Sequence, residues 1–134
     1  MLKKFDISTK KEDVYDITEA VRAYANESGI TEGTCVVYTA HTTAGICVTS
    51  KMDPDGFDDL RDEIKRLIPT RIDFKHQFDT PSDAAGHIKS SLIGVTMTFI
   101  ITEGKLLLGG SQGIYFLEFD GPRKRSYYVK VIAD

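Results

Sequence analysis

The sequence has little of what defines several large classes of protein. Its 134 residues include only two cysteines, Cys35 and Cys47, too few for a disulfide scaffold. Because both lie in apolar, strand-like runs, we expect reduced core thiols. There is no basic excess either, since 17 Lys+Arg against 20 Asp+Glu give a formal net charge of -3. Phosphate contacts dominate nucleic-acid affinity, so this balance argues against a nucleic-acid partner.

No hydrophobic run suggests a membrane protein. The charge-free stretch at 90–102 is well short of the ~18–20 residues that a membrane helix needs. The first residues, Met-Leu-Lys-Lys-Phe-Asp, lack the apolar segment of a signal peptide. We therefore expect a cytoplasmic protein without a membrane partner. The sequence also lacks internal repeats, low-complexity tracts and flexible linkers, so we expect residues 1–134 to form one domain.

The patterning that is present predicts a mixed fold. β-Branched residues and alternation predict strands at 2–8, 12–15, 33–39, 45–50, 95–102, 105–109, 113–120 and 125–132. Helical spacing of apolar residues predicts helices at 17–28, 54–68 and 83–93, with a long irregular loop at 69–82. The helices do not alternate with the strands. We expect an α+β fold: a mainly antiparallel, two-sheet, β-sandwich-like core flanked by about three helices.

Local signals indicate where the first two helices begin and end. Asp16 and Glu19 have the spacing of a capping box, and Gly29 suits a left-handed helix end. Asp53 is the expected N-cap of the second helix, with Pro54 at its first position. A solvated helix N-terminus explains the four aspartates at 53, 55, 58 and 59 better than a magnesium site, and their spacing excludes an EF-hand.

Three histidines are the main candidates for chemistry: His41, His76 and His87. They lack the H-x-x-x-H and C-x-x-C…H spacings, so no local motif demands zinc. His41 follows a predicted strand, and the hydroxyls of Thr42 and Thr43 beside it are suitable anion donors. His76, in the irregular loop, either faces a site or is solvated.

Asp83 and His87 are four residues apart, so a helix places both on one face. A carboxylate there can fix the imidazole tautomer and leave the other ring nitrogen for a metal or a proton. A helix-capping Asp83 beside an exposed His87 is an equally weighted alternative.

The glycine-rich segment at 106–113 is neither a P-loop nor a dinucleotide fingerprint, because it lacks the Lys-Ser/Thr pair and no helix follows. It predicts a hairpin with glycines at positive φ. The alternative is a cluster of backbone donors at Gly109 and Gly110, with Gln112 facing a ligand. Asp120 and Arg123 flank a Gly-Pro turn and predict a local ion pair, with Arg123 also a candidate anion ligand.

Several blocks, in this order, resemble the YjbQ family, also labelled the secondary thiamine-phosphate synthase family. The resemblance covers nearly the whole chain, and the blocks are highly specific only together. They are His41–Ile46, Asp53–Asp55, Asp83–Leu92, Leu106–Gly109 and Gln112–Arg123.

The resemblance implies two packed sheets and a homotrimer. It places His41, His76, His87 and Asp83 in one pocket near a subunit boundary, able to hold a metal (zinc or magnesium) or a phosphate, with His41, His76 and His87 as the candidate metal ligands. It implies no organic cofactor. Many members have Asn where this chain has Thr49 and Lys51, and Trp where it has Ser111, so the specificity of this chain is expected to differ.

The implied activity is a weak joining of a pyrimidine diphosphate to a thiazole phosphate. Diphosphate leaves the pyrimidine methylene while the thiazole nitrogen attacks, so growing charge must be neutralised and two reactants aligned. The catalytic candidates are His41, Asp83 and His87. The candidate ligands of the phosphorylated substrate are Thr42, Thr43, Lys89, Gly109, Gly110, Gln112 and Arg123.

Two further functions compete with this one. The first is a metal-dependent hydrolase, in which a His-bound zinc activates water. The second is a trimer without catalytic activity that binds a phosphorylated metabolite or a metal.

Overall fold

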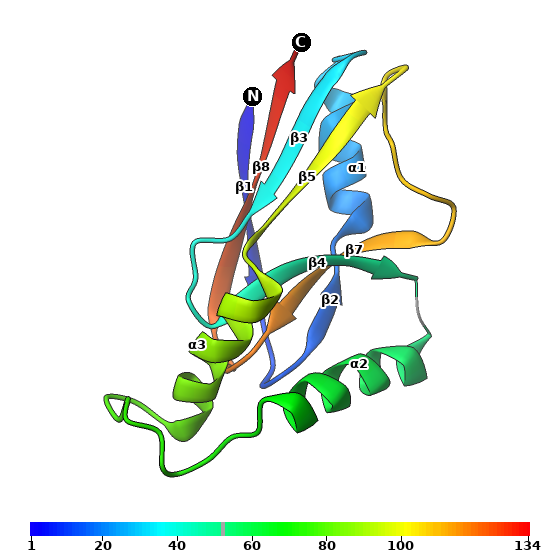
Figure 1. The fold of residues 1–134 in the computed structure, drawn as a ribbon. Coiled ribbons are helices and arrows are strands. Elements are labelled where there is room, and N and C mark those ends of the chain that lie inside the picture. The colour runs from blue at the N-terminus through cyan, green and yellow to red at the C-terminus, as the bar shows by residue number, and fades with distance from the viewer. Residues whose placement is uncertain (52) are drawn as a thin grey trace.

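A computed structural model describes residues 1–51 and 53–134 (Figure 1). This part of the chain forms three helices and two antiparallel sheets, which confirms the α+β prediction. The helices are α1 (Thr18–Glu27), α2 (Pro54–Leu67) and α3 (Pro81–Ile93). The strands are β1 (Leu2–Ser8), β2 (Val14–Asp16), β3 (Gly33–Tyr38), β4 (Ala44–Ser50), β5 (Thr96–Thr102), β6 (Lys105–Leu106), β7 (Gln112–Glu118) and β8 (Lys124–Ala133).

The larger sheet has the strand order β1-β8-β3-β5-β6, and the smaller has the order β2-β7-β4. Figure 1 shows α1 alongside the larger sheet and α2 beneath the smaller one. Both sheets and α1 contribute side chains to one core, so the two sheets pack as layers. Within the described residues, no helix combines the length and the apolar character needed to cross a bilayer.

Strand β7 separates two clusters of buried apolar side chains, one on each of its faces. Its alternate side chains Ile114 and Phe116 enter the core shared with the larger sheet. Tyr115 and Leu117 point the other way, against half-buried side chains of α2 such as Leu60. A strand buried on both faces reads as a continuous apolar run, which is the pattern of residues 114–117.

The helix ends follow the expected chemistry with two corrections. Asp53 accepts a hydrogen bond from the Gly56 amide at 2.8 Å, as a cap should. Half of the capping box before α1 is confirmed, because Asp16 accepts from the Thr18 amide at 2.9 Å; the other half is wrong, because Glu19 lies 3.6 Å from the Arg22 guanidinium instead of reaching back. Helix α3 begins at residue 81 and not at 83, because the Thr80 hydroxyl accepts from the third amide of the helix.

The glycine-rich segment does not form the predicted hairpin. β6 pairs with β5 in the larger sheet, whereas β7 pairs with β2 and β4 in the smaller one, so the segment crosses between sheets. Gly109 and Gly110 are not among the glycines with positive φ. The backbone N–H of Gly109 instead donates to the Gln112 side chain at 2.8 Å. Two consecutive apolar runs suggest a hairpin, but here the two strands, β6 and β7, pair with strands of different sheets.

A buried ion pair joins the end of β7 to the start of β8. The Arg125 guanidinium binds Glu118 through two nitrogens, with Nε 2.8 Å from Oε1. Its Nη2 also donates to the hydroxyl of Thr43 at 2.7 Å, and the Thr9 hydroxyl donates to Glu118. Both charged side chains are almost fully buried. Three segments that are distant in sequence, at Thr9, Thr43 and residues 118–125, therefore meet at one pair of charges.

Replacing one partner should leave the other as an uncompensated buried charge. We expect Glu118→Gln to lower the free energy of unfolding by about 3–5 kcal/mol, measured by urea denaturation. Glu63→Gln removes an exposed pair on α2 and should have a far smaller effect. A double variant, Glu118→Leu with Arg125→Met, should recover much of the loss. Equal effects of Glu118→Gln and Glu63→Gln would contradict this account.

Candidate functional site

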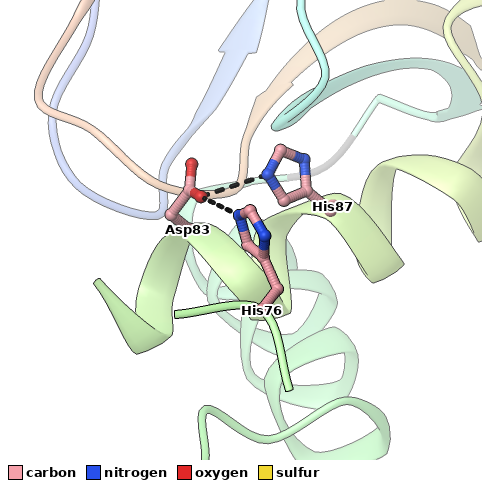
Figure 2. A group of neighbouring side chains, drawn as sticks. All are labelled: His76, Asp83 and His87. Carbon is pink, nitrogen blue, oxygen red and sulfur yellow. Dashed lines mark hydrogen bonds and ion pairs between the residues drawn. The ribbon is translucent and has the colours of Figure 1, made fainter. Parts of the chain in front are cut away.

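Two of the three histidines meet at one carboxylate (Figure 2). The Nε2 atoms of His76 and His87 each lie 3.1 Å from the same oxygen, Oδ2 of Asp83. One ligand atom from each of the three residues lies within 4.8 Å of the others. Asp83 is buried, whereas His76 is exposed and His87 is partly exposed. The carboxylate of the cluster is therefore buried, whereas its imidazoles are open to solvent.

Helix α3 positions this cluster for local reasons. Its first turn is fixed by the Thr80 cap and the proline at the first helical position. Gly86 then allows a close approach: a Cβ there would lie 3.1 Å from both Thr43 Cγ2 and the carbonyl oxygen of Phe119. The helix therefore packs directly on the segment before β4. This packing brings the His87 ring to the carbonyl of Thr42.

Both ring nitrogens of His87 face oxygens that can only accept. His87 Nδ1 lies 3.1 Å from the Thr42 carbonyl oxygen, and Nε2 lies 3.1 Å from the ionised Asp83 carboxylate. A neutral imidazole carries one N–H, so one of the two contacts then sets a ring lone pair against an oxygen lone pair. Two lone pairs facing one another at 3.1 Å need a cation between them, either a second proton or a metal ion. Donation of the other ring nitrogen to a carbonyl is typical of metal-bound histidine.

His41 lies outside this cluster. Its Nε2 accepts a hydrogen bond from the backbone N–H of Ser126 at 3.0 Å, so Nδ1 carries the proton in the neutral ring. Burial lowers the pKa of His41 from its ordinary value, and the nearby Arg125 guanidinium lowers it further. The structure thus brings His76, Asp83 and His87 together and holds His41 separately, as a neutral ring tied to β8.

His41 and His87 nevertheless line the same hollow, of about 490 Å³. Backbone and side chains before β4 form one wall, and the exposed face of α3 forms the other. Sequence reasoning missed Ser90 and Ser91. Ser90 lies three positions and Ser91 four positions after His87, so the helix places them on the same face as His87. The lining is Tyr38, Thr39, Ala40, His41, Thr42, His87, Ser90, Ser91, Gly94 and Val95.

Of the predicted substrate ligands near the histidines in sequence, only some lie near them in the structure. Thr42 lines the hollow, but Thr43 is buried and bonded to Arg125. Lys89 is 2% exposed and faces a small internal cavity near Glu12, and burial lowers the pKa of its ammonium. Thr43 is thus bonded to Arg125, and Lys89 lines a different cavity from the one that His87 lines.

Arg123 forms the predicted ion pair, with Nη2 2.7 Å from Asp120 Oδ2, and it also reaches Asp79 at 3.4 Å. Gly109, Gly110 and Gln112 belong to the crossing between the sheets, which Figure 1 shows on the side opposite α3. The structure therefore does not bring this segment to the histidines.

The three positions that depart from the family pattern lie near one another. The amide of Lys51 donates to the carbonyl of Ser111 at 2.7 Å, and Thr49 pairs with Gly113 two residues further along β7. They sit at the carboxyl end of β4, whereas α3, which carries Asp83 and His87, packs on Thr43 just before the amino end of β4. The departures are thus remote from the His–Asp–His cluster.

Neither cysteine is a candidate nucleophile. Both are free thiols, and burial raises the pKa of Cys35 and of Cys47 to about 11. A thiol with such a pKa is protonated at neutral pH, and only the thiolate attacks or binds metal efficiently.

Fold and site together define a small α+β protein with a solvent-facing His–Asp–His cluster. The chain belongs to the YjbQ family, because the family model described as UPF0047 protein YjbQ-like matches residues 3–134. This confirms the resemblance seen in the sequence. A UPF0047 protein of Methanocaldococcus jannaschii is 47% identical over 135 residues, which cover 100% of this chain and 96% of that protein. YugU of Bacillus subtilis is 41% identical, covering 99% of this chain and 100% of that one.

Solved structures show the same fold. A YbjQ-like protein of unknown function from Sulfolobus solfataricus has a TM-score of 0.94 at 29% identity, covering 100% of this chain and 97% of its own. An uncharacterized protein of the family from Clostridium acetobutylicum has a TM-score of 0.89 at 41% identity, covering 97% and 99%. The names of these relatives assign no activity, so the chemistry has to be argued from the site.

The His41 imidazole should titrate below its ordinary pKa of about 6.5, as measured by the pH dependence of its ring signals in NMR. Lys4→Ala should move the midpoint upward, because Lys4 is one of the cations that lower it. An unfolded chain protonates His41 more readily than the folded one. This contribution to stability is therefore full above about pH 6.5 and is lost as the pH falls toward the folded pKa. A midpoint above 6.5 would contradict the structure.

Proposed function

We propose that this protein is a cytoplasmic, metal-dependent enzyme that acts on a phosphorylated small molecule, with the metal held by His76, Asp83 and His87. The observation that carries the proposal is the His87 ring, whose Nδ1 is engaged by a carbonyl while its Nε2 faces a carboxylate oxygen. A divalent cation between these groups satisfies both. The reduced cysteines are consistent with a cytoplasmic location.

The donor set favours zinc over magnesium. Magnesium prefers oxygen ligands and keeps several waters, whereas imidazole nitrogen suits zinc. Two histidines and one carboxylate leave a coordination position open, as catalytic zinc sites do. The open side of this cluster faces solvent, because His76 is exposed. When bound, the metal supplies Lewis-acid stabilisation of charge on a phosphoryl oxygen.

The family resemblance names one reaction for such a site. In thiamine-phosphate synthesis, the thiazole nitrogen forms a bond to the pyrimidine methylene as the carbon–oxygen bond to diphosphate breaks. The electron pair of that bond leaves with the diphosphate. In this chain Thr42, Ser90 and Ser91 line the space where the reactants would be aligned. We propose this transfer as the activity, at a low rate.

Hydrolysis is the second candidate. The side chains of His76 and His87 are 44% and 37% exposed, so water reaches the cluster without any movement of the chain. A phosphate ester could then be cleaved with water as nucleophile. A site open to water suits hydrolysis better than a transfer that has to exclude it.

We also propose a homotrimer, as the resemblance implies. Large apolar side chains are exposed in and beside the loop that carries His76: Phe78 is 96% exposed and Ile72 is 90% exposed. On the outer face of α3, Leu92 is 71% exposed. Apolar side chains gathered in this way support an interface between subunits near the cluster.

Metal binding tests the central claim. Metal-free protein titrated with Zn²⁺ at pH 7.5 should bind one equivalent per chain by calorimetry, with proton release and weaker binding at pH 6. Asp83→Asn and His87→Ala should each weaken binding by at least ten- to a hundredfold. His41→Ala removes an imidazole from the same hollow and should leave the affinity unchanged.

Two results would count against the metal site. If the wild-type protein binds no Zn²⁺, and NMR shows both ring nitrogens of His87 protonated at neutral pH, then a proton is the cation. If His41→Ala weakens binding as strongly as His87→Ala, the ligand set includes His41.

Turnover separates the candidate activities. The zinc-loaded protein should form thiamine phosphate from the pyrimidine diphosphate and the thiazole phosphate, and His87→Ala should abolish this. Release of phosphate from simple esters with no joined product would favour the hydrolase. Ligand-induced thermal stabilisation, with no product in either assay, would favour a binding trimer.

A further inference from the structure

We propose that a second hollow, which shares His41 with the first, binds the phosphate group of the substrate. This hollow measures about 510 Å³ and opens over the end of the β1–β8 pair. It is lined by Lys4, Asp6, Ile7, Ser8, His41, Lys124, Arg125 and Ser126. The inference rests on the proposed function for the reacting end of that substrate, but the hollow itself is defined without the metal cluster.

Strand pairing gathers the polar groups on one face. Ser8 pairs with Lys124 and Asp6 pairs with Ser126, so these side chains lie side by side on one surface of the sheet. Lys4 is two residues before Asp6 on β1 and therefore points the same way. Two ammonium groups and two hydroxyls thus surround the hollow. Ammonium and hydroxyl groups donate hydrogen bonds to phosphate oxygens.

The balance of charge in the hollow is positive. The charge of Arg125 is matched by Glu118, to which its guanidinium is bonded. Among the described residues, the only acidic side chain in the lining is Asp6, which lies 3.9 Å from the Lys4 ammonium and is 82% exposed, so this pair is weak. The positive charge of Lys124 therefore remains to balance the negative charge of an incoming anion.

His41 connects this hollow to the site. It lines both hollows, and its Nε2 accepts from the amide of Ser126, a residue of the second hollow. The charged groups that act on His41 are Arg125, Arg123 and Lys4, opposed by Glu118. Burial is the main cause that lowers the pKa of His41, and the net positive charge of these groups lowers it further. A phosphate in the second hollow would offset that field, so His41 reports its binding.

The arrangement indicates the class of substrate. A molecule that spans both hollows would place a phosphate over β1 and β8 and its reacting end near His87. A phosphate monoester with a second functional group fits this description, as does one partner of a joining reaction. Specificity for a phosphorylated substrate would then come from Lys4 and Lys124, not from the metal.

Inorganic phosphate is the probe for this site. It is titrated into metal-free protein at fixed ionic strength, and both the affinity and the His41 ring signals are followed by NMR. Binding should raise the pKa of His41. Lys124→Ala should weaken binding roughly three- to fivefold and Lys4→Ala by a similar factor. Asp6→Asn should strengthen binding, because it removes the opposing charge.

Lys130→Ala is the matched control. Lys130 is exposed on the same strand, six residues from Lys124, and it carries the same charge outside the hollow. Equal weakening in Lys130→Ala and Lys124→Ala would show a non-specific charge effect and overturn the proposal. So would a wild-type protein with no detectable phosphate binding, or phosphate binding that is lost in His87→Ala but not in Lys124→Ala.

The Zn²⁺ titration keeps the two proposals apart. Lys4→Ala and Lys124→Ala should bind Zn²⁺ as the wild type does. If the wild type binds phosphate in the predicted manner but binds no Zn²⁺, the phosphate hollow stands and the metal enzyme does not. If Zn²⁺ binds as expected but the lysine variants leave phosphate affinity unchanged, the metal site stands and the second hollow is wrong.

Discussion

The bonded pair of Glu118 and Arg125 is the constraint on which the site depends. Burying one charge alone is costly, so each side chain requires the other in a fixed place, with its remaining donors and acceptors satisfied. Here those additional partners are Thr9, Thr43 and the amide of Asp120. The smaller sheet, the larger sheet and the segment before β4 are therefore held in one register by polar contacts, where apolar packing alone would tolerate sliding.

That constraint reaches the chemistry through two neighbouring residues. Because Arg125 holds Thr43, the carbonyl of Thr42 is fixed where it can accept from the His87 ring. On β8, the residue after Arg125 donates its amide to His41. One ion pair thus orients both imidazoles: the Nε2 of His87 faces the Asp83 carboxylate, and the Nε2 of His41 accepts from a backbone amide. The two histidines are chemically different because their backbone partners differ.

Sequence patterns were sufficient where local spacing decides the outcome. The four-residue interval between Asp83 and His87 correctly placed both on one helical face, and the succession of strands toward the C-terminus correctly indicated antiparallel sheets. His76 reaches Asp83 only through the path of the 69–80 loop, which no periodicity encodes. Glu118 drew no attention because it follows the apolar run of β7. The contacts of Thr43 and Lys89 were also hidden, since a polar side chain gives no local sign of whether it faces a ligand or a buried partner.

The cluster and the second hollow complement one another in charge. Asp83 lies at the base of the first, so an anion approaching the histidines without a cation would meet a buried carboxylate. A phosphate is attracted instead by the lysines over β1 and β8, where Asp6 alone opposes them. A metal reverses the sign at the cluster and makes it a second place for negative charge. With the metal bound, both ends of the space around His41 favour an anion, which suits a joining reaction in which one partner keeps its phosphate and the other releases diphosphate.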